Sequence, residues 1–188
     1  MAPGGTNAER TGAVIVFADE TALSLPPPVR ATWAPRGHTP TLRVRMGKRP
    51  KTSLVGWCCH PPDGPPKFLY RMVPGSVTDR ESIRQLPDVH RTFARPIVLV
   101  WDNLGSRRSR RMQAFAERVD GSTLVFLPPY SPDLDPVEGS WAHLKSGALA
   151  NLGARTLEEL VSVARQGLRH LQRHPALLNG FLAATDLT

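Results

Sequence analysis

The sequence predicts an α/β domain in which a mixed five-stranded sheet is flanked by helices on both faces. Two apolar runs, residues 14–18 and 96–101, have the length and the β-branched composition of buried strands. Residues 52–59 and 67–73 flank a segment rich in proline and glycine, which indicates a hairpin. The alternation of strand, helix and strand over residues 96–127 indicates a parallel pair. A chain of 188 residues is long enough for one such domain and too short for two of ordinary size.

The amino-terminal half is expected to hold three strands and one basic excursion. Residues 1–11 are small and polar without hydrophobic periodicity, so we expect a disordered leader there. The first strand, residues 14–18, is followed by three consecutive prolines, and residues 31–44 are then expected to form a basic β-excursion. Cys58 and Cys59 would face opposite sides of their strand, which predicts two buried thiols and neither a disulfide framework nor a zinc site.

The carboxyl-terminal half is expected to alternate helices and strands. A helix is predicted over residues 78–92, although Pro87 would break or kink it. The elements expected after it are a strand over residues 96–101, a helix over 107–119, a strand over 123–127, a helix that Glu138 opens, and a long helix that starts at a Thr156 capping box and ends before Pro175. The apolar stripe of the last helix has helical spacing and is expected to be core.

Three acidic residues are each expected at the end of one of these elements. Asp19 and Asp102 follow apolar strands, and Glu138 lies in the first turn of a helix that comes after another strand. If the strands before Asp19 and Asp102 are parallel and adjacent, the two carboxylates emerge about 5 Å apart at one edge of the sheet. Mg²⁺ and Mn²⁺ prefer carboxylate oxygens, so the three acids predict a site where two metal ions could promote attack on a phosphate.

Each acid also has an ordinary structural interpretation. Asp135, Pro136 and Glu138 fit a helix start in which the aspartate is the N-cap and the glutamate is its capping-box partner. Asp19 and Asp102 could simply end their strands, because aspartate favours turns. Glu20 is interpreted as a solvent-facing acid or a neighbour of the metal ligands, because adjacent strand residues point to opposite faces.

The residues around these acids resemble a known family. The segments Phe17-Ala-Asp-Glu-Thr, Trp33-Ala-Pro-Arg-Gly and Val100-Trp-Asp-Asn look like parts of the catalytic domain of DDE transposases of the mariner and bacterial insertion-sequence group. The most specific match is the motif Pro-Tyr-Ser-Pro-Asp-Leu-x-Pro-x-Glu-x-x-Trp, which ends at Trp141. The resemblance extends over residues 12–180.

The resemblance implies a ribonuclease H-like fold for residues 12–188, with Asp19, Asp102 and Glu138 as catalytic residues that bind two Mg²⁺ or Mn²⁺ ions. The implied activity is that of a DDE-type polynucleotidyl transferase or endonuclease. Such an enzyme cleaves DNA strands at insertion-sequence ends and then uses the freed 3′ hydroxyl for strand transfer. Members of this family carry a helix-turn-helix DNA-binding module ahead of the catalytic domain, and we expect that module to be absent here.

Two positions depart from the family pattern. Asp135 stands where the family usually has asparagine, and Ser106-Arg-Arg stands where a histidine is often found. Neither position is one of the three acids, but both leave the detailed geometry of the site and the role of Asp135 open.

The charge of the chain predicts an anionic partner. Lysine and arginine number 24 against 16 acidic residues, a formal charge of +8, and nucleic acid is the first candidate. Basic side chains near the acids are expected to contact DNA phosphates, which gives affinity without reading bases. These predicted DNA contacts are Arg36, Arg43, Arg45, Lys48, Arg49, Lys51, Arg107, Arg108, Arg110, Arg111 and Lys145.

Two other functions stay open from the sequence. The chain could be a catalytically idle or domesticated transposase fragment that acts only in DNA binding or interaction, or a different nuclease on the same fold. Expected partners are transposon-end and target DNA, with a possible upstream-frame product and a possible second copy. No apolar run is long enough for a membrane span, so we expect a bacterial cytoplasmic protein associated with the nucleoid.

Overall fold

A computed structural model describes residues 11–44, 51–77, 79–102, 122–185 and 187 of the chain. Most of the expected leader at residues 1–11 and the whole of the expected helix at residues 107–119 lie outside this part.

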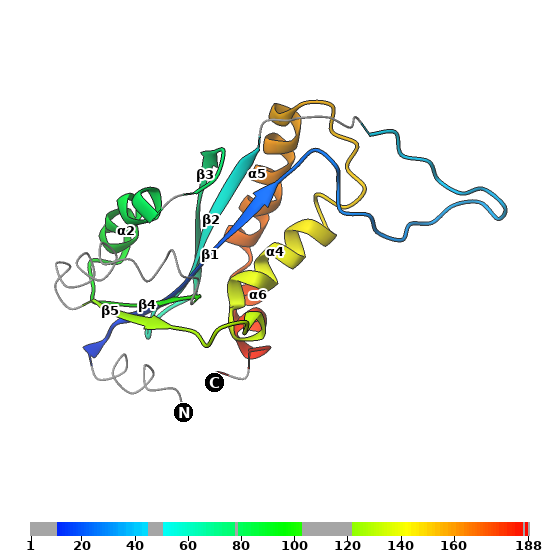
Figure 1. Cartoon of the computed structure of the whole chain (residues 1–188). Helices are drawn as coiled ribbons and strands as arrows, with labels where there is room; N and C mark the ends of the chain where they lie inside the picture. The colour runs from blue at the N-terminus through cyan, green and yellow to red at the C-terminus, as the bar shows by residue number, and fades with distance from the viewer. Residues whose placement is uncertain (1–10, 45–50, 78, 103–121, 186, 188) are drawn as a thin grey trace.

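The centre of the fold is a mixed five-stranded sheet, as predicted (Figure 1). The strands are β1 (Val14–Leu23), β2 (Thr52–His60), β3 (Lys67–Pro74), β4 (Ile97–Trp101) and β5 (Thr123–Phe126). Their order across the sheet is β3-β2-β1-β4-β5. The β1–β2 and β2–β3 pairs are antiparallel, whereas β4 runs parallel to both β1 and β5. The predicted hairpin and the predicted parallel pair are both confirmed.

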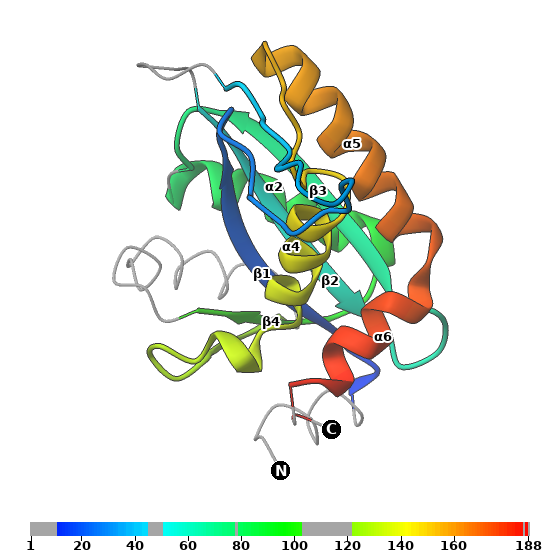
Figure 2. The same ribbon diagram turned by 90° about the vertical axis from the view of Figure 1, so that its right-hand side faces the viewer.

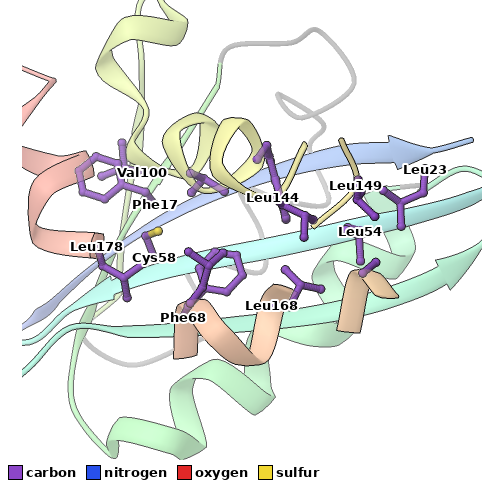
Figure 3. Close-up of a cluster of buried hydrophobic side chains, with 14 of the residues drawn as sticks. Phe17, Leu23, Leu54, Cys58, Phe68, Val100, Leu144, Leu149, Leu168 and Leu178 are labelled. Carbon is purple, nitrogen blue, oxygen red and sulfur yellow. The ribbon is translucent and has the colours of Figure 1, made fainter. Parts of the chain in front are cut away.

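Helices cover both faces of the sheet, so each face has its own core. Figure 1 shows α2 (Asp79–Phe93) on one side and α4 (Pro136–Ser146), α5 (Leu157–Arg173) and α6 (Pro175–Ala183) on the other. Residues of β1 alternate between the cores, because Val14 and Val16 pack on the α2 side and Phe17 packs on the α4 side. The side chains of the α4-side core interdigitate between the sheet and the helices in Figure 3.

The two cysteines follow the same alternation, as predicted. Cys58 lies in the α4-side core and Cys59 in the α2-side core, and both are unexposed. Burial raises the pKa of the Cys58 thiol to about 12, so it remains a neutral thiol at physiological pH.

The expected β-excursion at residues 31–44 is wrong. These residues form no strand, and all of them are exposed. They carry Pro35 and Pro40, which cannot donate to a ladder, and within the described part of the chain no strand lies beside them to accept pairing. They form a long loop that projects from the body of the molecule (Figure 1). Asn151 holds the base of this loop through its side-chain bonds to Arg30 N and Arg30 O, both of 2.9 Å.

The expected break at Pro87 is also absent, because α2 continues through this residue. Pro87 is exposed, whereas Val89, two residues later, is 2% exposed and packs in the α2-side core. Tertiary packing of this kind can outweigh the hydrogen bond that a proline removes. Among the described helices, none combines the length and the apolar character needed to span a membrane.

The packing around two helical glycines, Gly167 and Gly180, predicts that alanine has opposite effects on stability at the two positions. A Cβ at Gly167 of α5 would lie 2.9 Å from the Ala148 Cβ, whereas a Cβ at Gly180 of α6 would meet nothing within 4 Å. Alanine is favoured over glycine in helices, so Gly180→Ala should raise the free energy of unfolding by about 0.5–1 kcal/mol. Gly167→Ala should lower it by about 1–3 kcal/mol, because the extra methyl overpacks the contact. Urea denaturation of both variants tests this, and equal stabilisation by both would contradict the described packing.

Candidate active site at the end of the parallel strands

The position of Asp19 differs from the expectation in one respect. β1 does not end at this residue but continues to Leu23, so Asp19 lies inside the strand. The reason is the antiparallel neighbour, since β1 stays paired with β2 as far as Leu23 opposite Thr52. The parallel pairing of β1 with β4, however, ends with Ala18 opposite Trp101. Asp19 is therefore the first residue beyond the parallel ladder.

Asp102 occupies the equivalent place on β4. It directly follows Trp101, the last residue of that strand, so the register that pairs Ala18 with Trp101 sets Asp19 and Asp102 side by side on adjacent strands. Asp19 lies on the α4 side of the sheet, since Trp141 of α4 contacts it, and continuing the alternation of β4 by one residue from Val100 in the α4-side core would put Asp102 on the same side. Asp19 is 7% exposed and Asp102 is half-buried. The structure thus brings these two predicted site residues to one place.

A hydrogen bond joins the sheet to α4 at this place. The indole Nε1 of Trp141 donates to the Asp19 carboxylate oxygen Oδ2 over 2.9 Å. Trp141 is 1% exposed, so the bond is formed inside the core and is shielded from water.

The indole can reach Asp19 because the residue opposite Asp19 on β2 is a glycine. Gly56 pairs with Asp19, and a Cβ at Gly56 would lie 2.6 Å from Cη2 of Trp141. Any side chain at this position would therefore displace the ring. Phe68 of β3 also packs against the Trp141 ring in an edge-to-face contact, in which the two ring centroids are 5.8 Å apart. Gly56 and Trp141 were not among the predicted site residues. A glycine inside an apolar strand was the available signal, because it often marks a close approach.

Glu138 lies on the same helix, three residues before Trp141. Residues three apart in a helix are neighbours on its surface, so Glu138 lies one turn from the indole that contacts Asp19. Its side chain is exposed. Lys145 lies seven residues on, nearly on the same side of the helix. His143 lies on the opposite flank, where its ring stacks on His170 of α5.

The helix start does not use Glu138 as a capping-box partner. Asp135 is the N-cap, and its side chain accepts from Val137 N over 2.9 Å. The Asp135 N–H, which a capping-box glutamate would bind, donates to the Pro132 carbonyl over 3.0 Å. Asp135 thus serves as the N-cap of α4, and the capping-box interpretation of Glu138 is wrong. Glu20 lies next to Asp19 on β1, where alternation turns it to the other face of the strand.

The predicted basic residues are only partly placed by the structure. Arg36, Arg43 and Lys51 are exposed, and Lys145 is half-buried on α4. The other predicted DNA contacts lie outside the described residues: Arg45, Lys48, Arg49, Arg107, Arg108, Arg110 and Arg111.

Comparison with known proteins gives one family and one fold. Residues 14–161 match the family described as DDE superfamily endonuclease. The chain is 24% identical over 166 residues to the insertion element IS630 uncharacterized 39 kDa protein of Shigella sonnei, a match that covers 88% of this chain and 48% of that protein. It is 32% identical over 65 residues to the uncharacterized protein y4pE/y4sA of Sinorhizobium fredii, covering 35% of this chain and 45% of that one. The matched segments thus cover about half of each of these two relatives.

Solved structures of the Mos1 mariner transposase share the fold. The Mos1 catalytic domain aligns with a TM-score of 0.54 at 17% identity, over 96% of this chain and 87% of that one. A pre-cleavage Mos1 transpososome aligns with a TM-score of 0.61 at 19% identity, over 97% of this chain and 59% of that one. The sheet and its helices therefore have the ribonuclease H-like arrangement that the sequence implied.

The buried bond from Trp141 predicts a specific loss of stability. Trp141→Phe removes the donor to Asp19 together with the distal ring atoms that lie over Gly56. The free energy of unfolding should therefore fall by about 1.5–3 kcal/mol more than in a tryptophan-to-phenylalanine change that breaks no bond, the usual range for a bond to a charged group. Urea denaturation measures this change.

Trp57→Phe is the matched control for that variant. Trp57 is 3% exposed, and its Nε1 has no hydrogen-bond partner among the residues the structure describes. This substitution removes the same atoms without removing a bond. Equal losses in the two variants would show that the Trp141 bond adds nothing to stability.

Proposed function

The chain belongs to the DDE superfamily of endonucleases, and on that premise we propose that it is the catalytic domain of an insertion-sequence transposase. In this proposal it cleaves DNA strands at the ends of the element and then transfers them, with Asp19, Asp102 and Glu138 as the metal-binding residues. One observation carries the proposal. The last pair of the parallel β1–β4 ladder sets Asp19 beside Asp102, and the Trp141 bond ties the helix that bears Glu138 to Asp19.

The donor set suits a hard divalent cation. Three carboxylates supply the oxygen ligands that Mg²⁺ and Mn²⁺ prefer, and no thiolate competes with them, since both cysteines lie in the cores. As the side chains stand, no three His, Cys, Asp or Glu residues in the described part of the chain are grouped closely enough to hold a metal. Glu138 is exposed, so its side chain can turn toward the two aspartates without unpacking the core. Two bound ions would activate the attacking oxygen and stabilise the leaving oxygen of the phosphate.

The protein's own contribution is to hold the carboxylates in place. Trp141 fixes one oxygen of Asp19, and the β4 register fixes the backbone of Asp102. Preorganised ligands of this kind need less rearrangement when a charged substrate binds. In this proposal Lys145, on the same side of α4 as Glu138, contacts a phosphate near the reacting one.

DNA is the proposed substrate and partner. Mos1 structures that share the fold include a paired-end complex with Mg and one with Mn, which supports the same classes of partner and cofactor for this chain. We extend the proposal to both transposon-end and target DNA in a bacterial cytoplasm, at the nucleoid. A second copy of the chain is proposed as a further partner. An upstream-frame product is proposed as another, because the match covers 48% of the insertion-element relative.

The rival proposal is an idle fragment that only binds DNA. It predicts that the chain binds DNA with the same affinity with or without a divalent metal, and that it cleaves no DNA strand. The experiment below distinguishes the two proposals.

Asp19→Asn, Asp102→Asn and Glu138→Gln should each abolish Mg²⁺-dependent cleavage of a duplex that carries the element end. Each variant loses one anionic ligand but nearly keeps the shape of the side chain. Mn²⁺ affinity, measured by calorimetry, should fall at least tenfold in each variant, and it provides a readout independent of cleavage.

Glu20→Gln is the control, because it neutralises the adjacent acid on the other face of β1. It should keep both cleavage and Mn²⁺ affinity. Unchanged cleavage in the Glu138→Gln protein would remove Glu138 from the site. Absence of cleavage and of Mn²⁺ binding in the parent chain would favour the idle fragment.

The exposed loop should add phosphate contacts. Neutralising Arg36 and Arg43 together, by substitution with glutamine, should reduce the slope of log affinity against log salt by about 1.8, or about 0.9 for each phosphate contact. Fluorescence anisotropy with a labelled duplex at several salt concentrations measures this slope.

Arg71 and Arg91 supply a control with the same change of net charge. Both pair with Asp88 on the surface, so neither is available to a phosphate without breaking an ion pair. Neutralising these two should leave the slope nearly unchanged. The same reduction in both double variants would mean that only net charge matters.

A further inference from the structure

Tyr130 is the most exposed of the large hydrophobic side chains in the described part of the chain. Its relative exposure is 103%, equal to that of a side chain with no neighbours, so its ring contributes no buried area to the fold. It also has a positive φ of 58°, a left-handed conformation that a bulky residue adopts at a cost. The fold therefore holds an aromatic ring outward in a backbone conformation that such a residue rarely takes.

The segment around Tyr130 is stiff. Pro128 and Pro129 precede it and Pro132 follows Ser131, so three backbone φ angles near the tip are fixed by rings. The turn is closed by backbone hydrogen bonds from Leu134 N to Ser131 O and from Asp135 N to Pro132 O, of 3.2 and 3.0 Å. The ring is therefore already positioned before a ligand binds, so the segment loses little conformational entropy on binding.

The two ends of the segment are fixed at the candidate active site. At one end, Leu127 N donates to the carbonyl of Trp101 over 2.8 Å, and Trp101 is the residue before Asp102. At the other end, Asp135 caps the helix that bears Glu138. In Figure 2 the connection from β5 to α4 projects outward from the end of the sheet before it returns to the helix. The segment that bears Tyr130 thus begins beside the residue before Asp102 and ends at the helix that bears Glu138.

From these observations we infer that Tyr130 stacks on an unpaired nucleobase next to the phosphate that occupies the site. Every base has a π-face, so an exposed aromatic ring can bind it without reading sequence. Inside a duplex both faces of a base are covered by its neighbours, so the ring can reach only a base at a frayed or single-stranded end. The inference rests on the proposed function in one respect, because it takes DNA to be the substrate.

The experiment measures binding to two DNAs without metal, so that no strand is cut. One is a blunt duplex, and the other is the same duplex with a single-stranded extension whose first unpaired base is 2-aminopurine. Tyr130→Ala should weaken binding of the extended DNA by about 5- to 150-fold, the range for loss of one aromatic–base stack. It should leave binding of the blunt duplex unchanged. Stacking quenches 2-aminopurine, so fluorescence should fall on binding to the parent chain and not on binding to Tyr130→Ala.

Three further variants keep the inference falsifiable. Tyr130→Phe should behave like the parent, and Tyr130→Leu should behave like Tyr130→Ala, because the inference requires a ring and not a hydroxyl or bulk. Trp33→Ala removes another fully exposed ring, on the projecting loop, and should keep the parent's difference in affinity between the extended DNA and the blunt duplex. Alanine at residue 130 has the same backbone constraint as tyrosine, and the melting temperature should not change.

Several results would overturn the inference. They are unchanged affinity in Tyr130→Ala, equal weakening for blunt and extended DNA, a loss in Tyr130→Phe, or the same loss in Trp33→Ala. If the parent chain bound neither DNA, the proposed function itself would fail. If it bound both equally well whatever stood at residue 130, only the stacking role would fail.

Discussion

The hydrogen bond from the Trp141 indole to the Asp19 carboxylate is the constraint on which the rest of the site depends. A buried carboxylate needs a donor, and a buried indole N–H needs an acceptor, so each satisfies the other inside the core. The bond forms only because Gly56, opposite Asp19, leaves room for the ring. It ties the helical layer to the centre of the sheet. Since Trp141 and Glu138 share one flank of α4, the same bond sets the direction in which Glu138 faces.

The topology of the sheet explains why the candidate site lies between β1 and β4. The chain leaves β1 toward β2 on one side, whereas β4 is followed across the sheet by β5 on the other. Ligands of open α/β sheets bind at such a reversal, beyond the carboxyl ends of the parallel strands. Here the parallel ladder stops at Ala18 and Trp101, and the next residue of each strand is an aspartate. The place of the two carboxylates is therefore a consequence of strand order and register and does not require a special loop.

Much of this arrangement could be predicted from local patterns, and the failures have a common cause. Apolar runs, turn residues and strand–helix alternation are local signals, and they predicted the mixed sheet, the hairpin and the parallel pair of β4 and β5. The adjacency of Asp19 and Asp102 followed from them only on the condition that β1 and β4 are parallel neighbours, which the strand order confirms. Four features depend on contacts distant in sequence. β1 runs past Asp19 because β2 pairs with it, residues 31–44 form no strand because none lies beside them, and α2 continues through Pro87 because its flank is packed. The Trp141–Asp19 bond joins residues 122 apart. The sequence also allowed Glu138 to cap the helix by accepting from the Asp135 N–H. Only the structure shows that this N–H donates to the Pro132 carbonyl instead.

We propose that Asp19, Asp102 and Glu138 form one metal site whose geometry Trp141 holds. A crystal structure of the chain soaked in Mn²⁺, with anomalous scattering to locate the metal, tests it most directly. Manganese should be bound by oxygens of Asp19, Asp102 and Glu138, with the Trp141 indole still donating to Asp19. Manganese bound elsewhere, a site that lacks Glu138, or an indole that has left Asp19 when the metal is bound would contradict it.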